Sequence, residues 1–368
     1  MTIEAHTKAR QIELAQALPP TRVYLDTKFW LIARDVVRGV RTEAVDVAFV
    51  DRLAARVAAR EVFCPISETV FLELMKQSDR TSRRATAELV DAWSARATLI
   101  PAQTRIATEI AHFFHAVRYP GHVHPLDDLV WSKLSYVMGF VHPSKTPFDA
   151  ATELALQKAF LDHMWDRPLV EIVDHLAGVD ADAFDIDHVA LAQTLNDGVA
   201  AHAHTIDGFS AAYEEEVRGV VDLLGDVALD VMAGMAAKEG IAGPLPADRP
   251  GQVNMLKNLL VAMLKAPEPR RTLRTAHVLA TLHAAVRANK GRKFKPNDLP
   301  DFDHAAAAVG YCDAFFTDHK LCKLLTLPPV GLDTAFVCRV MSDVGDAVDW
   351  LGVLPHADRT PKDSAARA

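Results

Sequence analysis

Residues 297–325 read NDLPDFDHAAAAVGYCDAFFTDHKLCKLL, and this stretch decides the fold. The polar start around Asp301 and the alanine run after it predict a helix, because alanine is the best helix former and a carboxylate is favoured near a helix N-terminus. Residues 311–316 are apolar and aromatic and predict a buried strand. Thr317 and Asp318 follow at the strand's carboxyl end, where open α/β sheets bind ligands. Considered alone, the two aspartates are equally well explained as a helix cap and a turn residue.

A second acidic strand end occurs near the start of the chain. Residues 22–30, RVYLDTKFW, predict a short apolar strand that ends at Asp26 and is followed by Thr27. Residues 62–66 predict another strand, and the amphipathic, alanine-rich residues 44–60 predict a helix that joins the two. A strand–helix–strand connection of this kind is typical of a parallel sheet.

A third acidic position lies inside a helix. Ser67 is expected to cap the helix predicted over residues 67–77, SETVFLELMKQ. Glu73 lies in the middle of that helix among apolar residues, where an unpaired carboxylate is unfavourable. A solvated helix face or an ion pair with Lys76 is the alternative to a functional role. Glu68, in the first turn, is the replacement candidate if Glu73 lies on the wrong face.

These pieces together resemble a PIN domain, and more narrowly the larger prokaryotic PIN-like proteins with an NDxxDxxH…YCDxxxTD ending. The resemblance covers about residues 20–79 and 272–352. It implies an α/β fold with a three-layer α/β/α core and a parallel sheet, and a carboxylate cluster that holds Mg²⁺ or Mn²⁺ for cutting RNA. The residues that match the catalytic and metal-binding acidic set are Asp26, Glu73, Asp301 and Asp318.

The implied chemistry requires oxygen ligands. Hard divalent ions prefer carboxylates, water and phosphate, and one or two such ions can activate water for attack on a phosphodiester. Four carboxylates in one crevice without a metal would repel each other and raise their pKa values. Thr27, His304 and Thr317 are expected beside the ligands, although a packing role for His304 is equally open.

Positive charge gathers directly before the acidic helix start. The net charge of -8 argues against indiscriminate nucleic-acid binding, but a local patch can still neutralise phosphates. Single-stranded RNA is the favoured partner and DNA is the alternative. Ordinary solvated helix ends would give the same pattern. The residues expected to contact nucleic acid are Arg270, Arg271, Arg274, Lys290, Arg292 and Lys293.

The rest of the chain is organised around these segments. Residues 334–340 predict a final strand. The long segment between the two parts of the predicted core is interpreted as an insertion, and it is acidic over residues 149–239. It is expected to be a lid, a dimer interface or a partner-binding surface, and the three glutamates at 214–216 are expected to be solvated. The expected boundaries are a helical lead at 1–19, the first part of the core at 20–79, an all-helical insertion at 80–271, the second part of the core at 272–352, and a disordered tail at 353–368.

Composition narrows the function classes. The 368 residues are 50% hydrophobic, and no run approaches the roughly 18 uncharged apolar residues of a membrane-spanning helix. The four cysteines lack metal-type spacing, which fits a reducing compartment. A cytoplasmic protein with no membrane partner is therefore expected. A metal-dependent endoribonuclease is the favoured function. A structure-specific DNA nuclease would use the same chemistry, and a nuclease-dead binding or scaffold protein is disfavoured by the complete acidic set.

Overall fold

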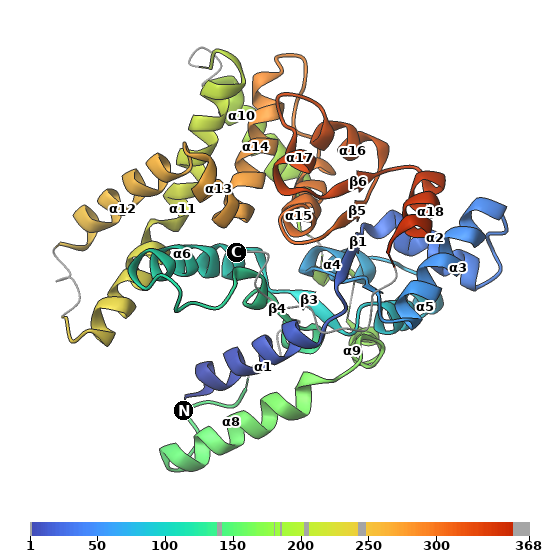
Figure 1. The fold of residues 1–368 in the computed structure, drawn as a ribbon, viewed down its shortest axis with the longest axis horizontal. Coiled ribbons are helices and arrows are strands. Elements are labelled where there is room, and N and C mark those ends of the chain that lie inside the picture. The colour runs from blue at the N-terminus through green and yellow to red at the C-terminus, as the bar shows by residue number, and fades with distance from the viewer. Residues whose placement is uncertain are drawn as a thin grey trace.

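The computed structural model describes residues 2–137, 142–179, 181–184, 186–201, 206–241 and 248–355, so most of the tail expected to be disordered lies outside these ranges. Its central sheet has four strands in the order β2-β1-β5-β6, and all neighbours run parallel. The strands are β1 (Thr21–Leu25), β2 (Val62–Phe63), β5 (Ala314–Phe316) and β6 (Arg339–Met341). Because β1 pairs with β5, an early and a late segment of the sequence lie side by side in the middle of the sheet (Figure 1). The predicted α/β class with a parallel sheet is confirmed.

Helices pack on both faces of this sheet. The helices around it are α2 (Thr27–Val37), α3 (Ala44–Ala58), α4 (Glu68–Met75), α15 (Asp298–Ala308), α16 (His319–Thr326), α17 (Leu332–Phe336) and α18 (Val344–Val353). On one face, the Phe316 ring packs against Phe29 of α2 and Phe49 of α3. On the other face, the Tyr24 ring packs edge-on against His304 of α15. Side chains alternate between the faces of a strand, so β1 and β5 supply apolar groups to both layers.

Two expected strands differ from the observed ones. β5 is shorter than residues 311–316, because the amides of Tyr311 and Cys312 both donate to the Ala308 carbonyl and extend the helix end instead. The prediction of one strand over residues 334–340 is wrong in its first half, which belongs to α17. The second half of the predicted strand is confirmed in part, since β6 begins at Arg339 and pairs with β5.

The segment predicted to be an all-helical insertion contains strands, so that part of the prediction is wrong. β3 (Ala97–Leu99) and β4 (Trp131–Lys133) form an antiparallel pair. A parallel bridge between Ile66 and Thr98 joins this pair to the chain just beyond β2. The Trp131 ring packs against Phe63 of β2, so the β3–β4 pair contributes to the hydrophobic core around the central sheet.

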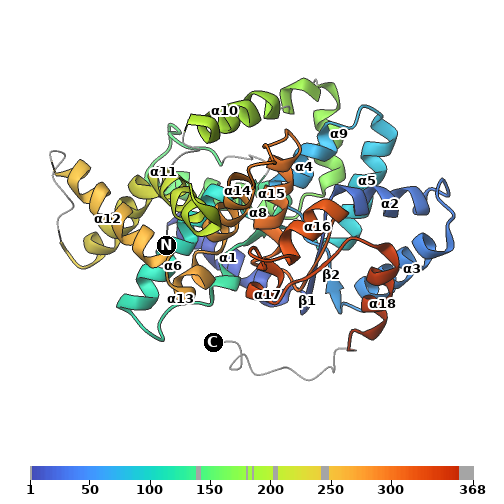
Figure 2. The same cartoon turned by 90° about the horizontal axis from the view of Figure 1, so that it is seen from above.

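The remaining helices divide between two apolar clusters. They are α1 (Ile3–Ala17), α5 (Arg80–Trp93), α6 (Ala102–Arg118), α7 (Leu134–Val137), α8 (Ala150–Trp165), α9 (Leu169–His175), α10 (His188–Ala201), α11 (Gly208–Lys238), α12 (Arg249–Met263), α13 (Pro267–Thr272) and α14 (Arg274–Ala288), with short 3₁₀ turns at Leu126–Asp128, Leu176–Gly178 and Ala181–Phe184. The first cluster surrounds the sheet and includes residues of α5, α8 and α9. The second is formed by α6, α11, α12 and one face of α14, at the end of the molecule opposite α2 and α3 (Figures 1 and 2).

Helix α14 contributes side chains to both clusters. The domain boundaries expected from the sequence therefore stay predictions, and one of them, between residues 271 and 272, falls at the end of α13, directly before this shared helix. Within the described ranges, no helix combines the length and the apolar character that crossing a membrane requires.

A buried carboxylate fixes α6 against the turn that precedes β5. Glu109 of α6 is fully buried, and its Oε1 accepts hydrogen bonds from the Thr275 amide at 2.9 Å and the Thr275 hydroxyl at 2.6 Å. The Tyr311 hydroxyl donates to the same oxygen. Burial raises the pKa of Glu109, while these hydrogen bonds favour its ionised form. The second cluster is thereby tied to the sheet by polar contacts as well as by packing.

An ion pair also joins α11 to α14. Glu216 pairs with Arg287, and its Oε2 lies 3.5 Å from His283 Nδ1. The side chains of Glu216 and Arg287 are each only 14% exposed. The expectation that residues 214–216 form a solvated face is therefore wrong for Glu216, which points toward α14.

Glu216→Gln is expected to lower the free energy of unfolding at pH 7 by about 2 kcal/mol, because it removes the charge from a largely buried ion pair. Urea denaturation measures this change. Glu215→Gln is the matched control, since Glu215 is exposed and its pair with Arg218 lies on one helix surface. The control should change stability by less than about 0.5 kcal/mol. Equal effects of the two variants would contradict an energetic role for the Glu216 pair.

Candidate functional site

Two aspartates lie at the carboxyl edge of neighbouring strands. The Asp26 amide donates to the Phe316 carbonyl at 3.0 Å and so continues the pairing of β1 with β5. The Asp26 side chain accepts from the Phe29 amide at 3.4 Å and caps α2. Asp318 follows β5 and caps α16, accepting from the Leu321 amide at 3.0 Å. The strand-end placement of both residues follows from the parallel pairing of β1 and β5.

Asp301 lies in the first turn of α15 and is electrostatically coupled to both strand-end aspartates. Its pKa is raised to about 7, first by burial and then by the charges of Asp318 and Asp26, while His304 opposes the shift. An ordinary aspartate has a pKa near 3.8. The charges of Asp318 and Asp26 thus add to the effect of burial on Asp301, so the three carboxyl groups are close enough to interact electrostatically.

Asp26 is buried, and its pKa is also raised. Burial is the main cause and the charge of Asp318 adds to it, whereas His304 and the Thr317 hydroxyl favour the ionised carboxylate. Within the part of the chain that the structure describes, Thr317 Oγ1 is buried without a hydrogen bond of normal geometry. The Thr317 hydroxyl is therefore near the Asp26 carboxylate but does not form a hydrogen bond of normal geometry with it.

Glu73 is held beside these groups by two donors. Its Oε2 accepts a hydrogen bond from the Thr27 hydroxyl and lies 3.1 Å from His304 Nε2. Burial raises the pKa of Glu73, but the hydrogen bond and charge of His304 and the Thr27 hydroxyl outweigh it, so the net shift is downward. Glu68 has an exposed side chain. Of the two glutamates, Glu73 is thus the one that contacts Thr27, the residue after Asp26, and His304, which is coupled to Asp26 and Asp301.

Two residues beneath the site extend this network. The Tyr24 hydroxyl lies 2.6 Å from Ser67 Oγ and 2.9 Å from His304 Nδ1. Ser67 precedes α4 as expected, but its side chain makes no capping hydrogen bond. Tyr24 was missed from the sequence. A signal for it existed, because Tyr24 precedes Asp26 by two residues in an extended strand, a spacing that puts both side chains on one face.

The donor set suits a hard divalent cation, although it does not form a closed ligand shell. Among the described residues, no three His, Cys, Asp or Glu side chains are arranged as a metal-binding group. Over the same ranges, no Lys or Arg forms an ion pair with Asp26, Asp301 or Asp318. Carboxylate oxygens are preferred ligands of Mg²⁺ and Mn²⁺, and a cation would offset the charges of Asp318 and Asp26 that add to burial in raising the pKa of Asp301. The residues present therefore fit such an ion.

Two of the arginines expected to contact nucleic acid are engaged inside the protein. Arg274 Nη1 lies 2.6 Å from Asp127 Oδ1, and the guanidinium packs over the Tyr311 ring. The Arg270 guanidinium packs over the Tyr213 ring and donates to a backbone carbonyl. Both side chains stabilise contacts around α13 and α14.

The other basic residues are more accessible. Arg292 pairs with Asp298 at 3.2 Å, one turn before Asp301 in α15. The side chains of Arg271, Lys290 and Lys293 are exposed. Lys290 and Lys293 thus carry exposed positive charge in the segment that precedes α15 in the chain.

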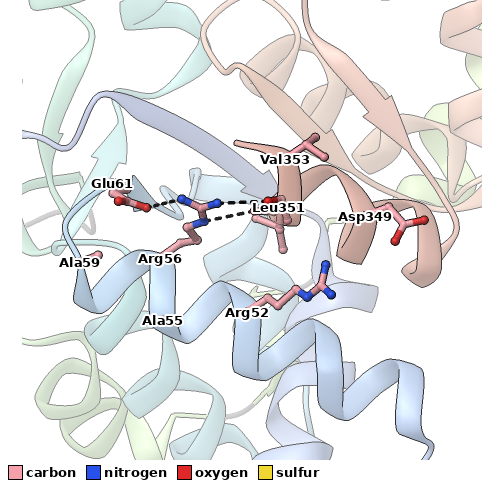
Figure 3. A pocket seen from close by; sticks show the side chains of 9 residues that line it. Arg52, Ala55, Arg56, Ala59, Glu61, Asp349, Leu351 and Val353 are labelled. Carbon is pink, nitrogen blue, oxygen red and sulfur yellow. Dashed lines mark hydrogen bonds and ion pairs between the residues drawn. The ribbon is translucent and has the colours of Figure 1, made fainter. Parts of the chain in front are cut away.

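A cavity of about 630 Å³ lies away from these carboxylates, between α3 and the end of α18 (Figure 3). Arg56 spans it, donating to Glu61 at 2.6 Å and to the Leu351 carbonyl at 3.1 Å. Glu61 directly precedes β2, so this cavity lies at the amino edge of the parallel sheet. The strand-end carboxylates lie at the opposite edge of the sheet. The cavity is therefore a space between α3 and the end of α18 and does not include the carboxylate site.

Comparison with known proteins adds no assignment to this geometry. No protein-family model matches the chain, and neither does any curated protein or solved structure. The likeness to PIN domains therefore rests on the sequence pattern, and the function it implies stays a proposal.

Proposed function

We propose that this chain is a Mg²⁺- or Mn²⁺-dependent endoribonuclease. The observation that carries the proposal is the grouping of Asp26 and Asp318, at the carboxyl ends of the paired strands β1 and β5, with the partly buried Asp301 that is coupled to both. Burial first, and then the charges of these neighbours, raise the Asp301 pKa to about 7. His304 offsets part of this negative charge, but among the described residues no Lys or Arg forms an ion pair with the three aspartates. Buried carboxylates without such partners oppose folding. A divalent cation would compensate these charges.

Each residue has a distinct task in this proposal. Asp26, Asp301 and Asp318 would hold the ion, and Glu73 would add a fourth negative charge fixed by Thr27 and His304. A bound divalent ion supplies Lewis acidity and lowers the pKa of a water molecule. The helix caps at Asp26 and Asp318 hold their side chains in place before any ligand arrives.

The exposed basic segment beside α15 supports a nucleic-acid substrate. Lys290, Arg292 and Lys293 lie just before Asp301 in the chain, and phosphate contacts of this kind supply sequence-independent affinity. RNA remains the favoured substrate because the resemblance to PIN-like proteins implies it. A DNA nuclease is the second candidate, since the carboxylates serve either phosphodiester equally well.

Labelled single-stranded RNA and DNA, incubated with the protein and Mn²⁺ and then with excess EDTA, test the proposal. RNA should be cut with Mn²⁺ and left intact with EDTA. Faster cutting of DNA would identify the second candidate. Binding of RNA without cleavage of either polymer would refute nuclease function and favour a binding protein.

Glu73→Gln is expected to slow RNA cleavage about 10-fold, because glutamine can still accept the Thr27 hydrogen bond but lacks the charge. Glu68→Gln is the matched control on the same helix, and its exposed side chain should be dispensable. Initial rates at saturating Mn²⁺ provide the comparison. If both variants cut at the wild-type rate, Glu73 does not belong to the site.

A further inference from the structure

Five side chains from both ends of the chain form one continuous hydrogen-bonded series beneath the carboxylates. In order they are Ser67, Tyr24, His304, Glu73 and Thr27. The three heavy-atom distances from Ser67 to Glu73 are 2.6, 2.9 and 3.1 Å. The series connects β1, α2, α15 and both the start and the middle of α4. It therefore links the position of Glu73 to Tyr24 and Ser67, which are buried behind His304.

Burial makes this arrangement specific. Tyr24 is 0% exposed, His304 2% and Ser67 3%, so water cannot replace a lost partner without rearrangement. A buried polar group without a hydrogen bond is costly, which favours keeping each contact. Glu73 is a carboxylate that accepts, so His304 Nε2 must carry the hydrogen that faces it. The Nδ1 atom is then free to bond with the Tyr24 hydroxyl.

We infer that Tyr24 is a positioning residue for the carboxylate site: with Ser67 behind it, its hydroxyl holds the His304 ring so that Nε2 stays directed at Glu73. The inference rests on the proposed function, since it concerns the same carboxylates. It extends that function to a residue that touches neither metal nor substrate. Removing a residue that hydrogen-bonds to a ligating side chain from behind commonly lowers metal affinity about 10- to 100-fold.

The alternative is that Tyr24 only fills space. Its ring packs edge-on against Phe315, with centroids 5.5 Å apart, and a phenylalanine would preserve that packing. Ser67 makes no capping hydrogen bond, so its hydroxyl serves Tyr24 rather than the start of α4. Tyr24→Phe and Ser67→Ala thus remove the hydrogen bonds and leave the apolar contacts and the helix cap position intact.

The chain contains a matched control in the second apolar cluster. The Tyr213 hydroxyl lies 2.8 Å from His277 Nδ1, and both residues are buried. Tyr213→Phe therefore deletes the same kind of tyrosine–histidine hydrogen bond away from the carboxylates. Any general consequence of losing a buried hydroxyl should appear in both variants.

The first test is a calorimetric titration of the protein with Mn²⁺ alone. Tyr24→Phe should bind Mn²⁺ about 10-fold more weakly than the wild type, and Tyr213→Phe should stay within about twofold. If Tyr24→Phe binds Mn²⁺ as tightly as the wild type does, the inference is overturned while the metal site stands. If Tyr24→Phe does not fold, Ser67→Ala takes its place, with a smaller loss expected in the same direction and no loss overturning the inference.

Histidine ¹⁵N NMR of the metal-free protein separates this inference from the proposed function. Because burial is outweighed by Glu73 and the neighbouring aspartates, which raise the His304 pKa, the spectrum is recorded at a pH high enough for the ring to be neutral. The His304 signal, assigned with His304→Gln, should then show one fixed form with hydrogen on Nε2 and a hydrogen-bonded Nδ1. Tyr24→Phe should shift the Nδ1 resonance, and Tyr213→Phe should not. A wild-type ring that averages between tautomers overturns the inference. If the wild type fails to bind Mn²⁺, the proposed function fails, and this spectrum alone then decides whether Tyr24 positions His304 and Glu73.

Discussion

Asp301→Asn is expected to lower Mn²⁺-dependent cleavage at least about 100-fold and to raise the melting temperature of the metal-free protein at pH 8. The loss of rate follows from removing a charged ligand, since several kcal/mol of transition-state stabilisation correspond to a factor of this size. The gain in stability follows from the same electrostatics in the opposite direction. Burial and the neighbouring Asp318 and Asp26 raise the Asp301 pKa to about 7, so its ionised form opposes folding.

The pH dependence has a definite sign. A carboxyl group whose folded pKa lies above its unfolded value contributes stability below the unfolded pKa, here about 3.8, and loses that contribution as pH rises through about 7. The wild-type protein in EDTA should therefore lose stability between these values because of Asp301. Asparagine has no charge to develop, so the variant should gain about 1–2 kcal/mol relative to wild type at pH 8 and little at pH 4, after allowance for solvent exposure.

Thermal melting at pH 4 and pH 8 in EDTA measures the pH dependence of stability, and melting with Mn²⁺ measures the stabilisation by the metal. Asp51→Asn serves as the control, because Asp51 is an exposed aspartate on α3. Added Mn²⁺ should stabilise the wild type more than Asp301→Asn, since an ion that binds only the folded state raises stability through that binding. A variant that melts lower than wild type at pH 8 and still cuts RNA would contradict the metal site.

The strand ends of this site could be predicted because they depend on short stretches of sequence. The apolar run before Asp26 and the residues after it specify a strand, a cap and a helix locally, and the same holds around Asp318. The parallel sheet then places the two residues side by side, since β1 pairs with β5. Glu73 was also predicted locally, as a carboxylate surrounded by apolar neighbours.

Other features depend on partners far away in the chain. β3 and β4 are only three residues each, and each forms a strand because it pairs with the other, which no local pattern indicates. Glu216 and Arg287 are 71 residues apart, so their ion pair could not be read from either segment. Residues 334–340 contain β-branched and aromatic side chains, which favour a strand. The first of these residues nevertheless belong to the short helix α17, which is flanked by Gly331 and Val337, both with positive φ. Tertiary contacts decided these cases against local propensity.

Asp26 allows the structural and the functional role of one side chain to be separated. Its carboxylate caps α2 through the Phe29 amide, and it also lies beside Asp301 and Asp318. Asparagine caps a helix about as well as aspartate, whereas alanine loses the cap at a cost of about 1 kcal/mol. Comparing Asp26→Asn with Asp26→Ala therefore isolates the charge from the cap.

Asp26→Asn is expected to keep the metal-free melting temperature or raise it, because burial already disfavours the charged form of this side chain. Its cleavage of RNA should nevertheless fall at least about 100-fold, and its stabilisation by Mn²⁺ should shrink. RNA binding in EDTA should persist through the exposed segment that carries Lys290 and Lys293. Asp26→Ala should be equally inactive and should melt lower. If Asp26→Asn retains wild-type cleavage and wild-type response to Mn²⁺ while only Asp26→Ala is impaired, Asp26 is a helix cap and the ion is held elsewhere.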